Sequence, residues 1–209
     1  MESSAFLDPD LPHLAATDAL VSEDGPWQAN ACVQWSVEQD MQAEGYRIAA
    51  ERLAEHAPQW HEQDFLLYPI VFLYRHYVEL RLKDLIGLGQ RLAHETVAVP
   101  ETHDLRRLWG TAKPHLEREL DPADRNRRRE ITEMQRVIQE LAALDPRGTA
   151  FRYATDAHGG RPLPNGARHL NLHHFSTTMT KLARALDDTG NWMHICLEHL
   201  QDMADHYGP

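Results

Sequence analysis

Apolar residues recur at three- and four-residue steps through most of this chain, which is the spacing that amphipathic helices require. Between residues 34 and 57 such positions alternate with Glu and Gln, and Pro58 is expected to end that helix. The same period returns over residues 103–120, over residues 122–144, and from Asn171 to near the end of the chain. The pattern therefore predicts several helices joined by short connections.

The stretch from Phe65 to Leu92 differs from the others because its first half, FLLYPIVFLY, is apolar on nearly every side. It is too long for a strand, and Pro69 is tolerated near a helix start. An apolar stripe continues through its more polar second half, at Leu67, Val71, Tyr74, Val78, Leu82 and Leu85. We predict that this segment is the central, most buried helix.

Several residues mark where the other helices begin and end. Thr102 is a candidate cap for the helix that starts at residue 103, Asp121 before Pro122 is a start signal for the next, and Asn171 is a candidate cap for the last. Thr189-Gly190-Asn191 offers a point at which the last helical region divides in two.

Two segments lack the helical period. Residues 1–25 are rich in Asp, Pro, Ala and Ser, which predicts a flexible arm, followed by a single domain over residues 26–209. Residues 149–168 contain a turn signal and two prolines, which predicts a small β-hairpin or loop insertion before the last helix. The predicted fold class is all-α, a helical bundle of about five helices.

Composition and charge narrow the range of partners. The chain has 209 residues, of which 42% are hydrophobic, and its net charge is −11, which disfavours a polyanion binder held by overall charge. Residues 101–170 are locally basic, with 13 basic and 11 acidic residues. The densest point is the run Arg125, Arg127, Arg128 and Arg129, which is either a solvated face paired with neighbouring acids or a patch that contacts phosphates.

The two cysteines, Cys32 and Cys196, form neither a disulfide framework nor a zinc ribbon, and they suit a reducing compartment. The N-terminal residues do not resemble a signal peptide, and no run of about 18 apolar residues occurs. We expect a cytoplasmic protein that does not span a membrane. Motifs of serine hydrolases, Rossmann folds and P-loops are missing from the sequence.

A group of charged residues interrupts the central apolar helix. Arg75, Glu79 and Lys83 fall at four-residue steps and so share one face, with His76 beside them. Charges in an apolar setting are costly unless they are paired. These residues therefore either form a structural network with His103 and Asp104 or line a functional cleft. In both cases we predict a cationic partner for Glu79.

These residues also carry a family resemblance. The string from Phe72 to Lys83, then His103-Asp104-Leu105 with Leu108-Trp109, then Phe151-Arg152-Tyr153 with Asp156, resembles bacterial proteins of the HEPN superfamily over roughly residues 62–190. The resemblance implies a small α-helical bundle. Many HEPN domains are metal-independent endoribonucleases, so it also implies RNA as substrate and a role as a toxin or phage-defence effector. A homodimer and an antitoxin or sensor partner are further expectations, and no cofactor is expected.

The catalytic signature of that superfamily is an arginine, often followed by a polar residue, and then a histidine after four to six residues. Histidine can transfer the proton of an RNA 2′-hydroxyl near neutral pH, and arginine holds phosphate with a planar fork. The better match is Arg168 with His173, where polar His169 follows the arginine. The second match, Arg152 with His158, falls in the predicted hairpin.

Two other interpretations remain open. One is a catalytically silent HEPN-like module that binds RNA, nucleotide or a protein partner. The other is a metal-dependent hydrolase, because Cys196, His199, Asp202 and His206 can share one helical face. Four ligands on one helix span too much length for one ion, so a second helix would have to contribute, through His56 with His61 or His173 with His174. We expect no metal.

Overall fold

The computed structural model describes residues 39–58, 62–96, 98–118, 123–146, 148, 150–152 and 169–207, besides the single residues 14, 20, 28 and 31. The chain divides into two compact units, residues 1–35 and 36–209, and the helices belong to the second. The arm expected over residues 1–25 lies almost wholly outside the described residues. The helices are α1 (Gln39–His56), α2 (Gln63–Leu92), α3 (Leu105–Arg118), α4 (Arg125–Leu144) and α5 (Leu172–Tyr207). The predicted all-α bundle of about five helices is confirmed.

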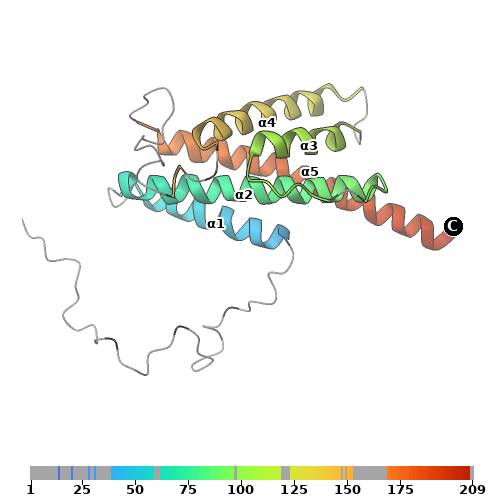
Figure 1. The fold of residues 1–209 in the computed structure, drawn as a ribbon, viewed down its shortest axis with the longest axis horizontal. Helices are drawn as coiled ribbons and strands as arrows, with labels where there is room; N and C mark the ends of the chain where they lie inside the picture. The colour runs from blue at the N-terminus through green and yellow to red at the C-terminus, as the bar shows by residue number, and fades with distance from the viewer. Residues whose placement is uncertain are drawn as a thin grey trace, which may run out of the picture. The chain divides into compact units, whose positions relative to one another are not determined.

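Helix α2 lies at the centre of the bundle, where it packs against α1, α3 and α5, while α4 packs on α3 and α5 (Figure 1). This arrangement explains why α2 is apolar on nearly every side. Five positions of its predicted stripe are buried, since Val71, Tyr74, Val78, Leu82 and Leu85 are all 0% exposed, and the sixth, Leu67, is partly buried. Pro69 lies inside the helix. The beginning of the helix is less buried, and Phe65 and Tyr68 there are exposed.

The caps of three helices are acids or amides. Asn171 caps α5 as predicted, because its Oδ1 accepts from the backbone N–H of His174 at 2.9 Å. The predicted Thr102 cap of α3 is wrong, because Asp104 Oδ1 accepts from Arg106 N–H at 2.9 Å. The carboxylate of Asp104 also suits the positive end of the helix dipole. Asp124 caps α4 in the same way, and the expected start signal at residues 121–122 lies outside the described residues.

The expected division of the last helix is also wrong, because α5 runs without a break from Leu172 to Tyr207. The Thr189 hydroxyl donates to the Ala185 carbonyl at 2.6 Å and accepts from Arg127 Nη2 at 2.7 Å, so it stabilises the helix there. A Cβ on Gly190 would lie 2.9 Å from Arg81 Nη2. Gly190 therefore leaves room for the Arg81 side chain to come close to the backbone, and it does not end the helix.

The insertion before α5 is described only at its beginning. Residues 150–152 form a turn, the part of the chain that the structure describes contains no strand, and residues 153–168 lie outside it. None of the described helices has the length and apolarity that crossing a bilayer takes.

Candidate functional site

The charged residues of α2 form a buried network that joins three helices. Arg75 is 3% exposed, and its Nη1 lies 3.2 Å from Glu79 Oε2. The same guanidinium donates from Nε to the carbonyl of Asp145 at 3.2 Å and from Nη2 to the carbonyl of His103 at 2.5 Å. Arg75 thereby connects the middle of α2 to the residue before Asp104 and to the end of α4.

Glu79 is the second centre of this network. Its Oε1 accepts from Lys83 Nζ at 2.8 Å and lies 2.8 Å from His103 Nδ1. The predicted cationic partner of Glu79 is therefore confirmed. Burial raises the pKa of this carboxyl, but the hydrogen bonds from Lys83 and His103 outweigh burial, and the net effect is a lowered pKa. Glu79 is thus an ionised carboxylate inside the protein.

Asp145 and Gly148 complete the network, and neither was predicted from the sequence to belong to it. Asp145 is 0% exposed, its Oδ2 lies 3.4 Å from Arg75 Nε, and its Oδ1 accepts from the Ala150 N–H at 3.0 Å. Gly148 has φ +71°, and a Cβ there would lie 2.8 Å from Arg75 Nη1. Asp145 and Gly148 therefore lie against the buried guanidinium, and the glycine is required by both backbone and space.

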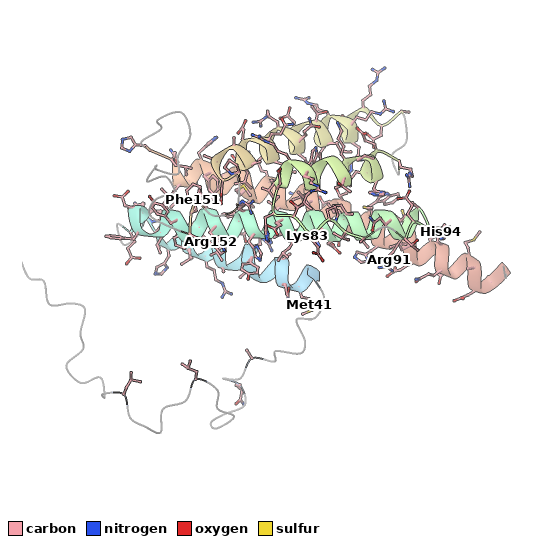
Figure 2. The ribbon with its side chains drawn as sticks, viewed as in Figure 1. Met41, Lys83, Arg91, His94, Phe151 and Arg152 are labelled. Atoms are coloured by element: carbon pink, nitrogen blue, oxygen red, sulfur yellow. The ribbon has the colours of Figure 1, made fainter. Side chains whose placement is uncertain are left out.

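An aromatic group adjoins the network on α2. His76 stacks on the Phe72 ring, with a centroid distance of 5.9 Å, and meets the Tyr46 ring of α1 edge-on at 4.4 Å. Arg152 lies over the Phe72 ring, with its Cζ 6.0 Å from the ring centroid. Figure 2 labels Lys83 near the middle of α2 and Arg152, from the turn at residues 150–152, nearer the beginning of that helix. Burial lowers the pKa of His76.

His103 has the geometry of a general acid or base. Its side chain is 73% exposed, whereas its partner Glu79 is 2% exposed. The carboxylate holds Nδ1, and Nε2 is left for solvent or a ligand. A buried carboxylate that orients an exposed imidazole is the arrangement that catalytic histidines commonly use. We call the set Phe72, His76, Glu79, Lys83, His103 and Arg152 the α2 polar face.

The structure brings some of the other predicted residues together and not others. Asp104 is the cap of α3 and does not join the network around Glu79. His169 and His173 are exposed, and His173 lines a cavity between α1 and α5. Arg168 and His158 lie outside the described residues, so the pairs Arg168–His173 and Arg152–His158 stay predictions.

The sequence also suggested a metal site on the last helix and a phosphate-contacting patch in the arginine run. Within the described part of the chain no group of three or more His, Cys, Asp or Glu side chains is arranged to hold a metal ion. His206 Nδ1 instead lies 3.1 Å from the carbonyl of Asp202. In the arginine run, Arg127 pairs with Glu130 and donates to Thr189. That arginine therefore ties α4 to α5.

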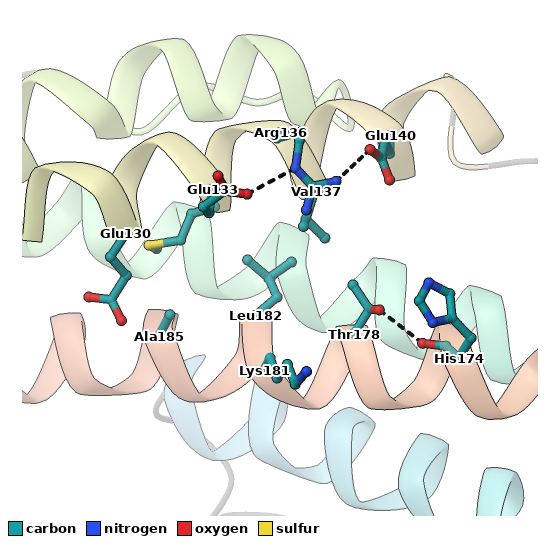
Figure 3. A pocket seen from close by; sticks show the side chains of 11 residues that line it. Glu130, Glu133, Arg136, Val137, Glu140, His174, Thr178, Lys181, Leu182 and Ala185 are labelled. Carbon is teal, nitrogen blue, oxygen red and sulfur yellow. Dashed lines mark hydrogen bonds and ion pairs between the residues drawn. The ribbon is translucent and has the colours of Figure 1, made fainter. Parts of the chain in front are cut away.

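A groove lies between α4 and α5 (Figure 3). It has a volume of about 460 Å³ and a floor formed by Met134, Val137, Leu182 and Ala185. Its α4 rim is acidic, but Arg136 pairs there with Glu133 at 3.0 Å and with Glu140 at 2.7 Å. These pairs neutralise part of the α4 rim, and His174 and Lys181 line the α5 side of the groove.

Comparison with known proteins does not assign this chain to a family. No family model, no curated protein and no solved structure matches it.

Proposed function

We propose that this protein is a metal-independent endoribonuclease of HEPN-like type, in which His103 transfers the proton. The observation that carries the proposal is the 2.8 Å contact between His103 Nδ1 and the buried carboxylate of Glu79. It fixes the ring while leaving Nε2 exposed. The α2 polar face also contains two cations, Lys83 and Arg152, which suits a substrate with a phosphate.

The reaction follows from the chemistry of RNA. His103 Nε2 takes the proton of a 2′-hydroxyl, the 2′ oxygen bonds to the adjacent phosphorus, and the bond from phosphorus to the 5′ oxygen breaks. The 5′ oxygen leaves with a proton from solvent. Lys83 and Arg152 oppose the negative charge that builds on the phosphoryl oxygens. The products are a 2′,3′-cyclic phosphate and a 5′-hydroxyl.

Two variants test which histidine is responsible. His103→Ala is expected to abolish RNA cleavage measured in EDTA. His173→Ala is expected to retain it, and its loss would move the site to the Arg168–His173 pair. The exposed His199 on α5 offers a matched control, since His199→Ala removes an imidazole from outside both sites. Full activity of both His103→Ala and His173→Ala would refute both proposed sites, and no RNA cleavage by the unaltered protein would refute the nuclease.

The second candidate is a catalytically silent HEPN-like module that binds RNA, nucleotide or a protein partner. The observation that favours it is that Arg75 is buried and that its guanidinium contacts Glu79, Asp145 and the His103 carbonyl within the protein. A purely structural network predicts RNA binding without cleavage, or no RNA binding. Filter binding of a labelled RNA beside the cleavage assay separates these outcomes.

The biological role that we propose is that of a toxin or phage-defence effector. The RNA cleavage activity of such a nuclease must be inhibited until it is needed. We also propose that the protein forms a homodimer and that an antitoxin or sensor controls it. Light scattering of the purified chain tests the dimer. Growth arrest on expression, relieved by His103→Ala, tests the toxic activity.

A further inference from the structure

A row of side chains, most of them aromatic, extends the α2 polar face towards the beginning of the helix. Its members follow one another at steps of three, four, four and three residues, which places them along one side of α2. They are Phe65, Tyr68, Phe72, His76 and Glu79. The row therefore leads from the first turn of the helix to the carboxylate that holds His103.

The two rings at the beginning of the row are exposed. Phe65 is 79% exposed and Tyr68 is 37% exposed, whereas Phe72 and His76 are half-buried. Single apolar side chains at the surface are common, and they need no ligand to explain them. Two neighbouring rings in line with a buried carboxylate and an exposed imidazole are different, because together they form a surface suited to flat, stacking groups.

The turn at residues 150–152 supports this row. Phe151 is buried, and its ring centroid lies 5.9 Å from that of Tyr68. The next residue, Arg152, lies with its Cζ 6.0 Å from the Phe72 ring centroid. Figure 2 shows both residues near the beginning of α2, with Lys83 further along the helix. The contact with Phe151 limits the motion of the Tyr68 ring, and Arg152 places a cation beside the row.

Rings and cations in one line are the combination that binds single-stranded nucleic acid. Unpaired bases stack on the rings, and the cations attract the phosphates between them. A duplex offers no free base face to such a row, because its bases stack on one another. We propose that unpaired bases of RNA stack on Phe65 and Tyr68 while the phosphate to be cleaved lies at His103. The proposal rests on RNA being the substrate of His103, as proposed above.

The spacing along α2 indicates which bases these are. Phe65 precedes Glu79 by 14 residues, which is about 21 Å along a helix. For Tyr68 the separation is 11 residues, or about 16 Å. Stacked nucleotides are spaced by about 3.4 Å along a strand, so the stacked bases lie within about six nucleotides of the bond that is cleaved. Stacking accepts every base, so these two rings select unpaired RNA and not a base sequence.

Fluorescence anisotropy with 2′-O-methyl RNA tests the proposal without cleavage, because the methyl group blocks the 2′ oxygen as a nucleophile. The probe is a labelled strand of about 12 nucleotides, long enough to reach the rings on either side of the bond at His103. It contains only adenosine and cytidine, so that it does not pair with itself. We expect the single strand to bind at least about tenfold more tightly than the same strand paired with its complement.

Phe65→Leu separates stacking from general apolar contact. It keeps an apolar side chain at an exposed position but removes the ring, and it should weaken binding of the single strand by about tenfold. Phe65→Trp restores a ring and should retain the binding of the unaltered protein. Trp192→Ala is the matched control, because it removes a 51% exposed aromatic ring from α5 and should leave the affinity unchanged.

The possible results separate this site from the nuclease. Binding that depends on the Phe65 ring, without RNA cleavage by the unaltered protein, would support the stacking site and refute the nuclease. Cleavage together with full binding by Phe65→Leu would refute the stacking site and leave the nuclease in place. No binding of the single strand, equal affinity for single strand and duplex, or equal weakening by Trp192→Ala would also overturn the stacking site.

Discussion

The imidazole of His103 lies 2.8 Å from the carboxylate of Glu79, although 24 residues separate the two in the chain. The contact joins an exposed ring to a carboxylate buried in the most apolar helix of the bundle. Glu79 also holds Lys83 and Arg75, so one acid neutralises or orients three basic side chains. Such an acid is both a structural centre and the residue that positions the candidate catalytic histidine.

Replacing Glu79 by Gln is predicted to destabilise the fold by about 3 kcal/mol, because it leaves Arg75 and Lys83 without their shared counter-charge in a buried setting. Urea unfolding monitored by circular dichroism measures the change. Glu140→Gln, which breaks an exposed pair with Arg136, is the matched control and should cause no resolvable change. Equal effects of the two substitutions on the free energy of unfolding would show that burial of the network does not determine its contribution to stability.

The α2 stripe and the partner of Glu79 could be predicted because they depend on residues three or four positions apart, or on a charge that must be paired. The contact between Arg75 and Asp145 could not be predicted from the sequence, since 70 residues separate the two. The packing of α3 and α4 determines where the turn that begins at Asp145 lies. Asp145-Pro146 carries the signal of a helix end, which is correct but incomplete. The burial of the Asp145 carboxylate follows from the packing of the helices and could not be predicted from the local sequence.

The errors at Thr102 and Gly190 have related causes. Thr102 and Asp104 are both good caps, and local preference does not decide between them. Helix α5 passes through Thr189-Gly190 because tertiary contacts with Arg127 and Arg81 compensate for a weak helix former. Tertiary contacts thus decided the second of these positions. His76, Glu79, Lys83 and His103 were predicted as a polar network or cleft, whereas catalysis was predicted at Arg168 and His173, so the catalytic role that we propose for His103 depends on its contact with Glu79.

Gly148→Ala is predicted to destabilise the protein by about 2 kcal/mol or more. The substitution puts a Cβ on a residue at φ +71° and within 2.8 Å of the Arg75 guanidinium. Gly45→Ala is the matched control, because a Cβ on Gly45 meets nothing within 4 Å inside α1. It should stabilise the protein by about 1 kcal/mol. Thermal unfolding of both variants checks the contrast, and a neutral Gly148→Ala would contradict the close approach.

His76 is predicted to make stability depend on pH. Burial lowers its pKa in the folded protein, so the unfolded chain binds more protons. Its stabilising effect is therefore fully present above the unfolded pKa of about 6.5 and is lost as the pH falls below it. His76→Phe keeps an aromatic ring on Phe72 and should make stability less sensitive to pH between about 7.5 and 5.5. A change of the same size in His199→Gln would show that His76 is not responsible.

The proposed chemistry predicts how the RNA itself controls cleavage. If His103 activates a 2′-hydroxyl, a substrate with one 2′-deoxy nucleotide at the scissile position loses its nucleophile and should resist cleavage there. The same RNA should be cut normally at other sites, because binding through phosphates is unchanged. Cleavage should continue in EDTA and leave 2′,3′-cyclic phosphate ends, since proton transfer by His103 and charge neutralisation by Lys83 and Arg152 supply what a metal would otherwise supply. Gel analysis of end-labelled RNA measures both. Cleavage at the deoxy position, or products with 5′-phosphate ends, would mean that water attacks the phosphorus, and the role proposed for His103 would then be wrong.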